Sequence, residues 1–342
     1  MKLRCLQAEH GDAFIIEISD GDEKHYVVID GGPSSKYCID DIVGELNKLS
    51  QIDLMVLTHY DDDHIAGLIE YVNGHQQGNF PVKRIWSNCS KDIHVSTTST
   101  ISYGQAQTLD TLLEIIAGRQ VLIKEDKINN TLPKIDLGFC KIQILSPSPA
   151  SLKANIEMYV KEMGTIASTR VDADSKKALE VLANNMNKKC KEGVDVINRS
   201  SIAFTIEAEG KTFLMMGDAD PWIVLAKLNE LGYTEDNPLQ VDLMKVSHHG
   251  SKNNTCNELL DVLNCSNYLI STNGGYGNTY HPDRETIAKI LLHSKRKSEV
   301  PTTLYFNYDL KDIEKRIGTL LTKEEEKKHN CQIKRVVVYP GY

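Results

Sequence analysis

The spacing of apolar residues in the first part of the chain predicts short strands and helices in alternation. Residues 14–18 and 26–29 are apolar segments on either side of Asp20-Gly21-Asp22, a cluster of turn-forming residues, so we expect two strands joined by a turn. Apolar residues at positions 39, 42, 43, 46 and 49 recur at helical spacing, and the apolar run 54–57 is typical of a buried strand. The predicted order is therefore strand, strand, helix, strand.

The same alternation returns in the second part of the chain. Apolar positions 202, 204 and 206, the Glu209-Gly210 turn and the apolar segment 212–216 predict another pair of strands. Asp220-Pro221 predicts the start of a helix, because Asp is a favourable N-cap and Pro fits the first helical position. From about residue 300 we expect a strand, one charged helix over 311–328 and a closing strand. Strands and helices in both parts predict an α/β fold.

One segment interrupts this alternation. It opens at Ser146-Pro-Ser-Pro149 and runs to about residue 195, and apolar residues at 179, 182, 183 and 186 lie on one helical face. We interpret it as a helical insertion or lid near the mouth of a site, and a solvated surface excursion is an equally good interpretation. We expect a single domain, with an N-terminal half at 1–146, the insertion at about 147–195 and a C-terminal half at 196–342.

The composition narrows the class of protein and its location. The 342 residues are 41% hydrophobic and 25% charged, as in ordinary globular proteins, and the apolar runs are far shorter than the roughly 18 residues that span a bilayer. Charged residues break the N-terminus before a signal-peptide core forms, so we expect a cytoplasmic protein with no membrane contact. Eight cysteines without a C-x-x-C pair are typical of reduced thiols rather than of disulfides or a cysteine-based zinc site.

The charge balance limits how a polyanion can bind. Lys and Arg number 39 against 47 Asp and Glu, which gives a formal net charge of −8. A protein that grips duplex nucleic acid over its whole surface is usually basic, so we expect nucleic acid or another phosphodiester to make only local contacts. The 14 tyrosines can stack on bases, but basic residues are not interleaved with them, so we attach little weight to a stacking surface.

The strongest chemical signal is the segment Thr58-His59-Tyr60-Asp61-Asp62-Asp63-His64, directly after the apolar run that ends at Leu57. Two imidazoles and three carboxylates packed at a strand end repel one another and lose solvation unless a cation neutralises them. Histidine nitrogen and carboxylate oxygen are ligands for zinc and manganese. A surface acidic turn is the alternative, but the flanking histidines and the preceding strand favour a metal site.

Three later strand ends offer partners for this segment, because four residues so close in sequence cannot surround two ions alone. Gly217-Asp218 ends one apolar strand, and His248-His249-Gly250-Ser251 ends another. Asn278-Thr-Tyr-His281-Pro282 follows a glycine-rich loop and opens a helix. A single Gly-Asp or His-Pro pair is weak evidence, whereas several polar strand ends in one chain predict a shared site.

Taken together, these motifs resemble the metallo-β-lactamase family, in the branch typified by the soluble hydrolase domain of the ComEC DNA-uptake channel. His10-Gly-Asp-Ala13 and Val28-Ile-Asp-Gly-Gly32 resemble the N-terminal strands of that branch, and Asn198-Arg-Ser-Ser201 resembles its Asn-x-x-Ser stretch. The resemblance runs to about residue 293 and excludes the insertion. It implies a four-layer αββα sandwich of two similar halves, with metals at one edge between the sheets.

The resemblance also implies two divalent ions, zinc or manganese. The implied ligands are His59 and Asp61 for the first ion, Asp63, His64 and His248 for the second, and Asp218 as a bridge between them. Asp61 stands where the commonest pattern has a second histidine, and Asn198 stands where many members place another ligand histidine. Both departures remove imidazole, so manganese rivals zinc, and occupancy by a single ion stays open.

The implied reaction is hydrolysis by a metal-activated hydroxide, and a phosphodiesterase, most of all a nuclease, is the favoured form. Asp63 would orient the hydroxide as well as bind metal. His281, or less favourably His249, would hold the developing oxyanion or protonate the leaving group. A capping role beside Pro282 competes with this interpretation of His281. Lys245 and Ser251 are expected to contact an anionic substrate, although an edge-strand lysine is an equally good interpretation of Lys245.

Further residues are expected to support this site. Asp12 and Asp30 are strand-end carboxylates that would orient the metal ligands, and Asn198 would do so or contact substrate. Histidines outside the motifs, His10 among them, are interpreted as ordinary surface or core residues.

Two other functions stay open: a small-molecule hydrolase acting on a cyclic nucleotide, a phosphocholine-like ester or a lactam, and a metal-binding regulatory protein without turnover. The sequence predicts no particular protein partner.

Overall fold

The N-terminal strands and those that follow them in sequence form one large sheet. A computed structural model describes residues 1–339 except 89–100, 162–176, 185–194 and 278. The strands of this first sheet are β1 (Lys2–Cys5), β2 (Phe14–Asp20), β3 (Glu23–Ile29), β4 (Leu54–Val56), β5 (Arg84–Trp86), β6 (Ile123–Glu125) and β17 (Val338–Tyr339). They lie in the order β17-β1-β2-β3-β4-β5-β6. β2 and β3 pair antiparallel across Asp20 and Glu23, which confirms the predicted strand pair and turn.

A second large sheet follows in sequence and packs against the first. Its strands are β7 (Ile135–Asp136), β8 (Lys141–Ser146), β9 (Ala203–Ala208), β10 (Lys211–Met215), β12 (Leu243–Lys245), β14 (Asn267–Ile270), β15 (Thr302–Phe306) and β16 (Cys331–Arg335). Their order is β16-β15-β14-β12-β10-β9-β8-β7. Two short strands, β11 (Leu239–Val241) and β13 (Leu263–Cys265), pair separately. The chain therefore enters the second sheet at β7 and returns to the first at β17.

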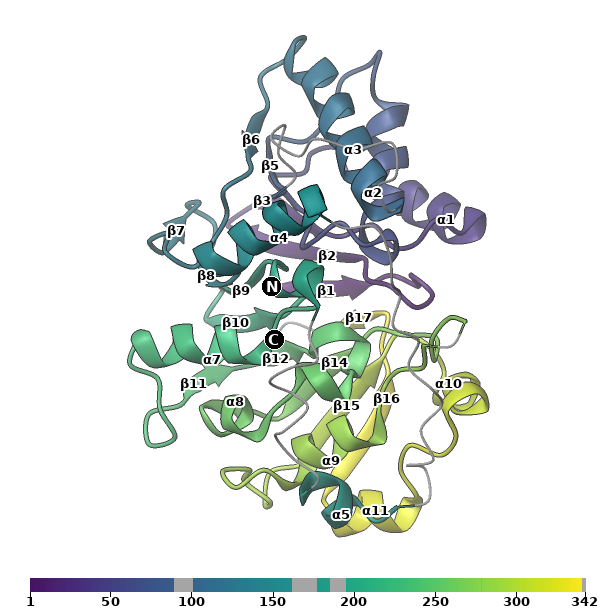
Figure 1. Ribbon diagram of the computed structural model, residues 1–342, viewed down its shortest axis with the longest axis vertical. Helices are drawn as coiled ribbons and strands as arrows, with labels where there is room; N and C mark the ends of the chain where they lie inside the picture. Colours follow the sequence, from purple (N-terminus) through teal and green to yellow (C-terminus); the bar gives the residue numbers. More distant parts are fainter. Residues whose placement is uncertain (89–100, 162–176, 185–194, 278, 340–342) are drawn as a thin grey trace.

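Helices cover the outer faces of both sheets (Figure 1). α1 (Lys36–Leu46), α2 (Asp62–Gly74) and α3 (Ile101–Ala117) share an apolar core with the first sheet. The remaining helices in the described part of the chain are α4 (Pro149–Lys161), α5 (Leu179–Asn184), α6 (Val196–Arg199), α7 (Pro221–Glu230), α8 (Asn257–Asp261), α9 (Arg284–Leu292), α10 (Leu310–Ile317), α11 (Lys323–Lys328) and the 3-10 turns η2 (Ser247–Gly250) and η3 (Lys252–Asn254). Of these, α5 and α7 to α10 share a core with the second sheet. The predicted αββα architecture is confirmed.

A third apolar cluster joins the inner faces of the two sheets. Phe14 of β2, Phe204 of β9 and Phe213 of β10 are among its fully buried members. Fully burying such a side chain stabilises the fold by about 1.5–3 kcal/mol. Sheet-to-sheet packing therefore fixes the position of one set of strand ends relative to the other.

The C-terminal helix differs from its prediction. The single charged helix expected over 311–328 is wrong, because α10 ends at Ile317 and α11 starts only at Lys323. Gly318 takes a φ of +81°, outside the helical region, and Thr322 caps α11 through a capping box with Glu325. The strand β16, which no pattern predicted, follows and pairs with β15.

The predicted insertion contains α4 and α5, whereas its residues 162–176 and 185–194, Met186 included, lie outside the described residues. α5 buries Leu179, Leu182 and Ala183 on one face, as the spacing predicts, and shares a core with α9. Glu180 pairs with Lys328 of α11. This part of the insertion therefore covers helices of the second sheet, and its proximity to the mouth of the site stays a prediction. No helix in the described ranges is both long and apolar enough to cross a bilayer.

Candidate metal centre

The predicted ligands lie where strands of both sheets end at a common edge. β3 and β4 are parallel neighbours in the first sheet, and β10, β12 and β14 are parallel neighbours in the second. Carboxyl ends of parallel neighbours meet at the same edge, where ligands commonly bind in α/β folds. The segments after β3, β4, β10 and β12 carry Asp30, residues 58–64, Asp218 and residues 247–251.

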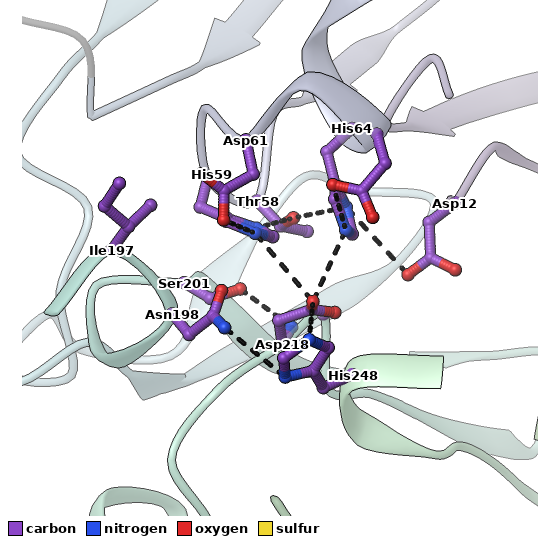
Figure 2. A network of polar contacts seen from close by, with 12 residues as sticks. Asp12, Thr58, His59, Asp61, His64, Ile197, Asn198, Ser201, Asp218 and His248 are labelled. Atoms are coloured by element: carbon purple, nitrogen blue, oxygen red, sulfur yellow. Dashed lines mark hydrogen bonds and ion pairs between the residues drawn. The ribbon is translucent and has the colours of Figure 1, made fainter. Parts of the chain in front are cut away.

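Four imidazoles surround one oxygen of Asp218. Its Oδ2 lies 3.9 Å from Nε2 of His59, 3.5 Å from Nε2 of His64, 3.8 Å from Nε2 of His248 and 3.7 Å from Nε2 of His249. Figure 2 shows three of these contacts converging on Asp218. His59 and His64 come from the first sheet, whereas Asp218 and the histidine pair come from the second. The centre therefore exists only where the two sheets meet.

Two further carboxylates flank this cluster. Asp61 Oδ2 lies 3.5 Å from His59 Nε2, and Asp63 Oδ2 lies 3.3 Å from His249 Nε2. Asp61 is the N-cap of α2 and Asp63 is in its first turn, where acidic side chains offset the helix dipole. The structure thus brings Asp61 to the His59 side of Asp218, and Asp63 to the His64 and His249 side.

These residues fit divalent cations. Nε2 of His59, His64 and His249, and Oδ1 of Asp218, are buried without a hydrogen-bond partner within the described residues. Burying such atoms unsatisfied is costly, and a cation among them removes the cost. Donor atoms of Asp12, His64, Asp218 and His249 also lie within 4.8 Å of one another. Imidazole nitrogen with carboxylate oxygen suits zinc or manganese.

Asp30 orients His64 from outside the cluster. It is buried, and its carboxylate accepts hydrogen bonds from Thr58 N at 2.8 Å, Thr58 Oγ1 at 2.7 Å and His64 Nδ1 at 2.8 Å. Because Nδ1 carries the proton in this arrangement, Nε2 of His64 is left as an acceptor facing Asp218. The position of Asp30 agrees with its predicted supporting role.

His248 and His249 are neighbours in sequence whose rings point in different directions. Both have left-handed backbone conformations, with φ of +48° and +51°. Nδ1 of His249 donates to Ser271 O at 3.0 Å, so its Nε2 faces Asp63. His248 instead places Nδ1 3.1 Å from Asn254 Oδ1. The predicted grouping of His248 with Asp63 and His64 is wrong, because His249 is the histidine next to Asp63.

Asn198 lies beside His248 and not among the converging donors. Asp195 caps α6 and accepts hydrogen bonds from Asn198 N at 2.9 Å and Asn198 Nδ2 at 3.1 Å. The same amide nitrogen lies 3.3 Å from Nδ1 of His248 (Figure 2). Asn198 therefore lies against the Nδ1 edge of the His248 ring, and the Nε2 atom of that ring faces Asp218.

The expected substrate contacts of Lys245 and Ser251 need correction. Lys245 is fully buried, forms an ion pair with Asp12 and donates to Gly217 O at 2.9 Å. Ser251 is also buried, and its hydroxyl caps η3. Neither side chain lines the cavity above the centre. Lys245 therefore balances the negative charge of the centre from below rather than contacting substrate.

The charges of the cluster perturb its titration. Burial lowers the pKa of His249, but the carboxylates of Asp218 and Asp12 outweigh burial and raise that pKa to about 10. Burial raises the pKa of Asp218, but the nearby histidines outweigh it and hold the pKa well below the usual range. Burial lowers the pKa of Lys245, and Asp12 and Asp218 raise it above its ordinary value. The Asp218 carboxylate is therefore ionised and available to a cation.

Comparison with known proteins gives a family match for the part of the chain that carries His59, Asp61, Asp63 and His64. Residues 7–142 match the metallo-beta-lactamase superfamily. They form a metallo-beta-lactamase superfamily domain. The chain is 22% identical to ComE operon protein 3 of Bacillus subtilis (strain 168) over 343 aligned residues. The alignment covers 92% of this chain and 34% of that protein. The chain thus spans about a third of the length of this curated relative.

Solved structures of the same fold show low sequence identity. The metallo-beta-lactamase fold protein YhfI from Bacillus subtilis matches with a TM-score of 0.44 and 10% identity over 99% of this chain and 98% of that one. Zinc-bound PqqB from Methylobacterium extorquens matches with a TM-score of 0.41 and 10% identity over 98% of each chain. The superfamily domain and the donor set of this chain together indicate a metal-dependent hydrolase.

A cavity of about 280 Å³ opens onto the centre. It is lined by His10, Asp62, Asp63, His248, His249, Thr272, Gly275, Tyr276, Thr279 and His281. His281 faces His248 with ring centroids 5.2 Å apart, and its Nδ1 lies 3.4 Å from Asp283 Oδ2. The predicted role of His281 at the leaving group is compatible with this position and stays a prediction.

Sequence reasoning missed two residues of this cavity. His10 was interpreted as an ordinary surface or core histidine, and Tyr276 was given no role. The structure stacks the two rings on each other at the cavity wall. The available signal was the glycine-rich loop before His281, in which Tyr276 stands between two glycines. Asn278 of the same predicted motif lies outside the described residues.

Proposed function

We propose that this protein is a metal-dependent phosphodiesterase that cleaves nucleic acid. The observation that carries the proposal is the convergence of four imidazole Nε2 atoms on Oδ2 of Asp218, with Asp61 and Asp63 on two sides of it. The resemblance of the motifs to the hydrolase domain of a DNA-uptake channel supports nucleic acid as the substrate.

The donor set supports two cation positions that share Asp218. His59 and Asp61 form one group, and Asp63, His64 and His249 form the other. Divalent cations at such paired positions polarise a phosphoryl oxygen, lower the pKa of a water molecule and stabilise the attacking and leaving oxygens of an in-line displacement. A paired site of this kind suits a phosphodiester, which has both oxygens on one phosphorus.

The chain's own residues supply orientation and proton transfer. Asp63 lies at the floor of the cavity, where its carboxylate can orient the attacking water. His281 lies on the wall, where its imidazole can donate a proton to the leaving oxygen. Asp30 holds His64 in the tautomer that a metal ligand requires. Thr58 holds Asp30 in turn through two hydrogen bonds.

The experiment that tests this function begins with metal-free protein. We expect about two manganese or zinc ions per chain by elemental analysis, and metal-dependent cleavage of single-stranded DNA or RNA as well as of bis-p-nitrophenyl phosphate. The variant D218N should lose both metal and activity. His75→Ala is the matched control, because His75 caps the opposite end of the helix that carries His64. This variant should keep both properties.

The possible outcomes separate the alternatives. Cleavage of the generic diester without cleavage of either polymer would replace the nuclease by a small-molecule diesterase. Metal binding without turnover of any diester would favour the regulatory protein. Full metal content in the Asp218 variant would overturn the metal centre itself.

A further inference from the structure

We propose that Tyr276 is a platform on which a nucleobase next to the scissile phosphate stacks. The proposal rests on the phosphodiesterase function above and adds what the substrate must carry beside its phosphate. It concerns the wall of the cavity and not the metal ligands.

The Tyr276 ring has one covered face and one open face. His10 lies against it with ring centroids 4.9 Å apart and an interplanar angle of 17°, within the range of offset stacking. The tyrosine nevertheless remains 70% exposed and lines the cavity. Nδ1 of His10 is buried and has no hydrogen-bond partner in the described part of the chain. A flat ring entering the cavity can therefore continue the stack that His10 begins.

The loop beneath Tyr276 is built to hold it still. Tyr276 and Thr279 exchange both backbone hydrogen bonds, each 2.9 Å long. Arg316 of α10 donates from Nη1 to Gly275 O at 2.6 Å. Gly275 has a φ of +110°, and a Cβ there would lie 2.1 Å from Thr279 O, so no other residue fits. A ring that is already positioned loses little conformational freedom when a ligand stacks on it.

The surroundings specify the chemistry of the ligand. The cavity places Asp63 and His249 of the metal centre and the ring of Tyr276 around the same space. Among its lining residues there is no lysine or arginine, so a phosphate has to be met at the metal centre. Large hydrophobic side chains are exposed at several described positions, but only Tyr276 of these lines the cavity. A nucleotide carries both a phosphate and a flat ring, so it suits this cavity.

This geometry favours an unpaired strand. A base can stack on Tyr276 only after it leaves its neighbours in a duplex, and aromatic platforms in proteins that bind single strands work in this way. Such stacking accepts every base, because each has a π-face. The platform therefore predicts preference for single-stranded substrate with little preference for sequence.

Two substitutions at one position test the platform. Tyr276→Leu keeps apolar bulk and removes the ring, whereas Tyr276→Phe keeps the ring. The substrates are a thymidine tetranucleotide and the same backbone made of abasic tetrahydrofuran units, in the presence of manganese. We expect Tyr276→Leu to raise KM for the thymidine substrate by about tenfold or more and to leave the abasic substrate within about twofold. Tyr276→Phe should behave like the parent protein on both.

The results distinguish a failed platform from a failed enzyme. If Tyr276→Leu retains the parent preference for the thymidine substrate, the platform is refuted while the phosphodiesterase stands. If the metal-loaded parent cleaves neither tetramer, the nuclease assignment fails. The platform is then judged by calorimetric binding of thymidine 5′-monophosphate against 2-deoxyribose 5-phosphate. A base-dependent affinity that Tyr276→Leu removes and Tyr276→Phe keeps supports it, and any other pattern overturns it.

Discussion

Replacing Asp30 by Asn changes one atom in the support of the metal centre. Asp30 has a φ of +58°, which Asn tolerates better than other residues, so the backbone need not move. The amide oxygen can keep the hydrogen bond from Thr58 N, and Thr58 Oγ1 can reverse its role from donor to acceptor. His64 can reverse its role only by changing tautomer, because its Nδ1–H would otherwise face an NH₂ group at the former 2.8 Å contact.

The substitution therefore favours the other tautomer of His64. With Nδ1 as acceptor, Nε2 carries the proton and cannot bind a cation. Losing a charge-assisted hydrogen bond of this kind costs about 1.5–3 kcal/mol. Removing the carboxylate partner of a metal-ligating histidine typically weakens metal affinity by about 10- to 100-fold. We expect zinc or manganese affinity of D30N to fall within that range.

The assay is a competition titration of metal-free protein against a chelator of known affinity. The chain offers a matched control in Asp261, which accepts from His293 Nδ1 at 2.9 Å outside the centre. Asp261→Asn should lower the free energy of unfolding, measured with urea, and leave metal affinity unchanged. Equal metal affinity in D30N and the parent protein would refute the argument that Asp30 sets the His64 tautomer.

Three more outcomes follow from the same structure. Lys245→Met removes the buried ammonium that pairs with the buried carboxylate of Asp12, so we expect a loss of about 3–5 kcal/mol in urea unfolding. A loss below about 1 kcal/mol would show that this pair is dispensable. Removing metal with a chelator should lower Tm, because a ligand that binds the native state stabilises it by about 4 kcal/mol at about 1,000 times its Kd. An unchanged Tm would contradict binding of the cation by the folded state. Burial raises the pKa of three buried thiols, Cys38, Cys140 and Cys331, to about 12. Iodoacetamide at pH 8 followed by peptide mapping should therefore leave these three cysteines unmodified, and rapid labelling would show that they are accessible.

The fold was predictable because its elements repeat strong local signals. The turn at Asp20-Gly21-Asp22 and the N-cap at Asp220 act within a few residues of themselves, and both appear in the structure where expected. Gly318 also acts locally, yet a run of charged residues on both sides of it masked the break between α10 and α11. The αββα class could be predicted from the order of the elements and the resemblance of the motifs alone.

The details of the site depended on distant residues. Sequence alone cannot separate His248 from His249, because Asn254 and Ser271 decide where each ring points. Lys245 gives the pattern of an ordinary strand residue, and only the approach of Asp12 from the other sheet buries its ammonium. The loop that carries Tyr276 is held by Arg316, forty residues away in sequence, which donates to Gly275 O. No local sequence pattern predicts this contact.

Because the ligands come from both sheets, the apolar layer between the sheets helps to determine the geometry of the metal centre. Side chains such as Phe204 and Phe213 set the spacing across which His59 and His64 reach Asp218, although they touch no donor atom. Shortening one of them would let the sheets settle closer together and change the cation–ligand distances by a fraction of an ångström. Selection for a different ion can therefore proceed through hydrophobic substitutions while every coordinating residue stays the same.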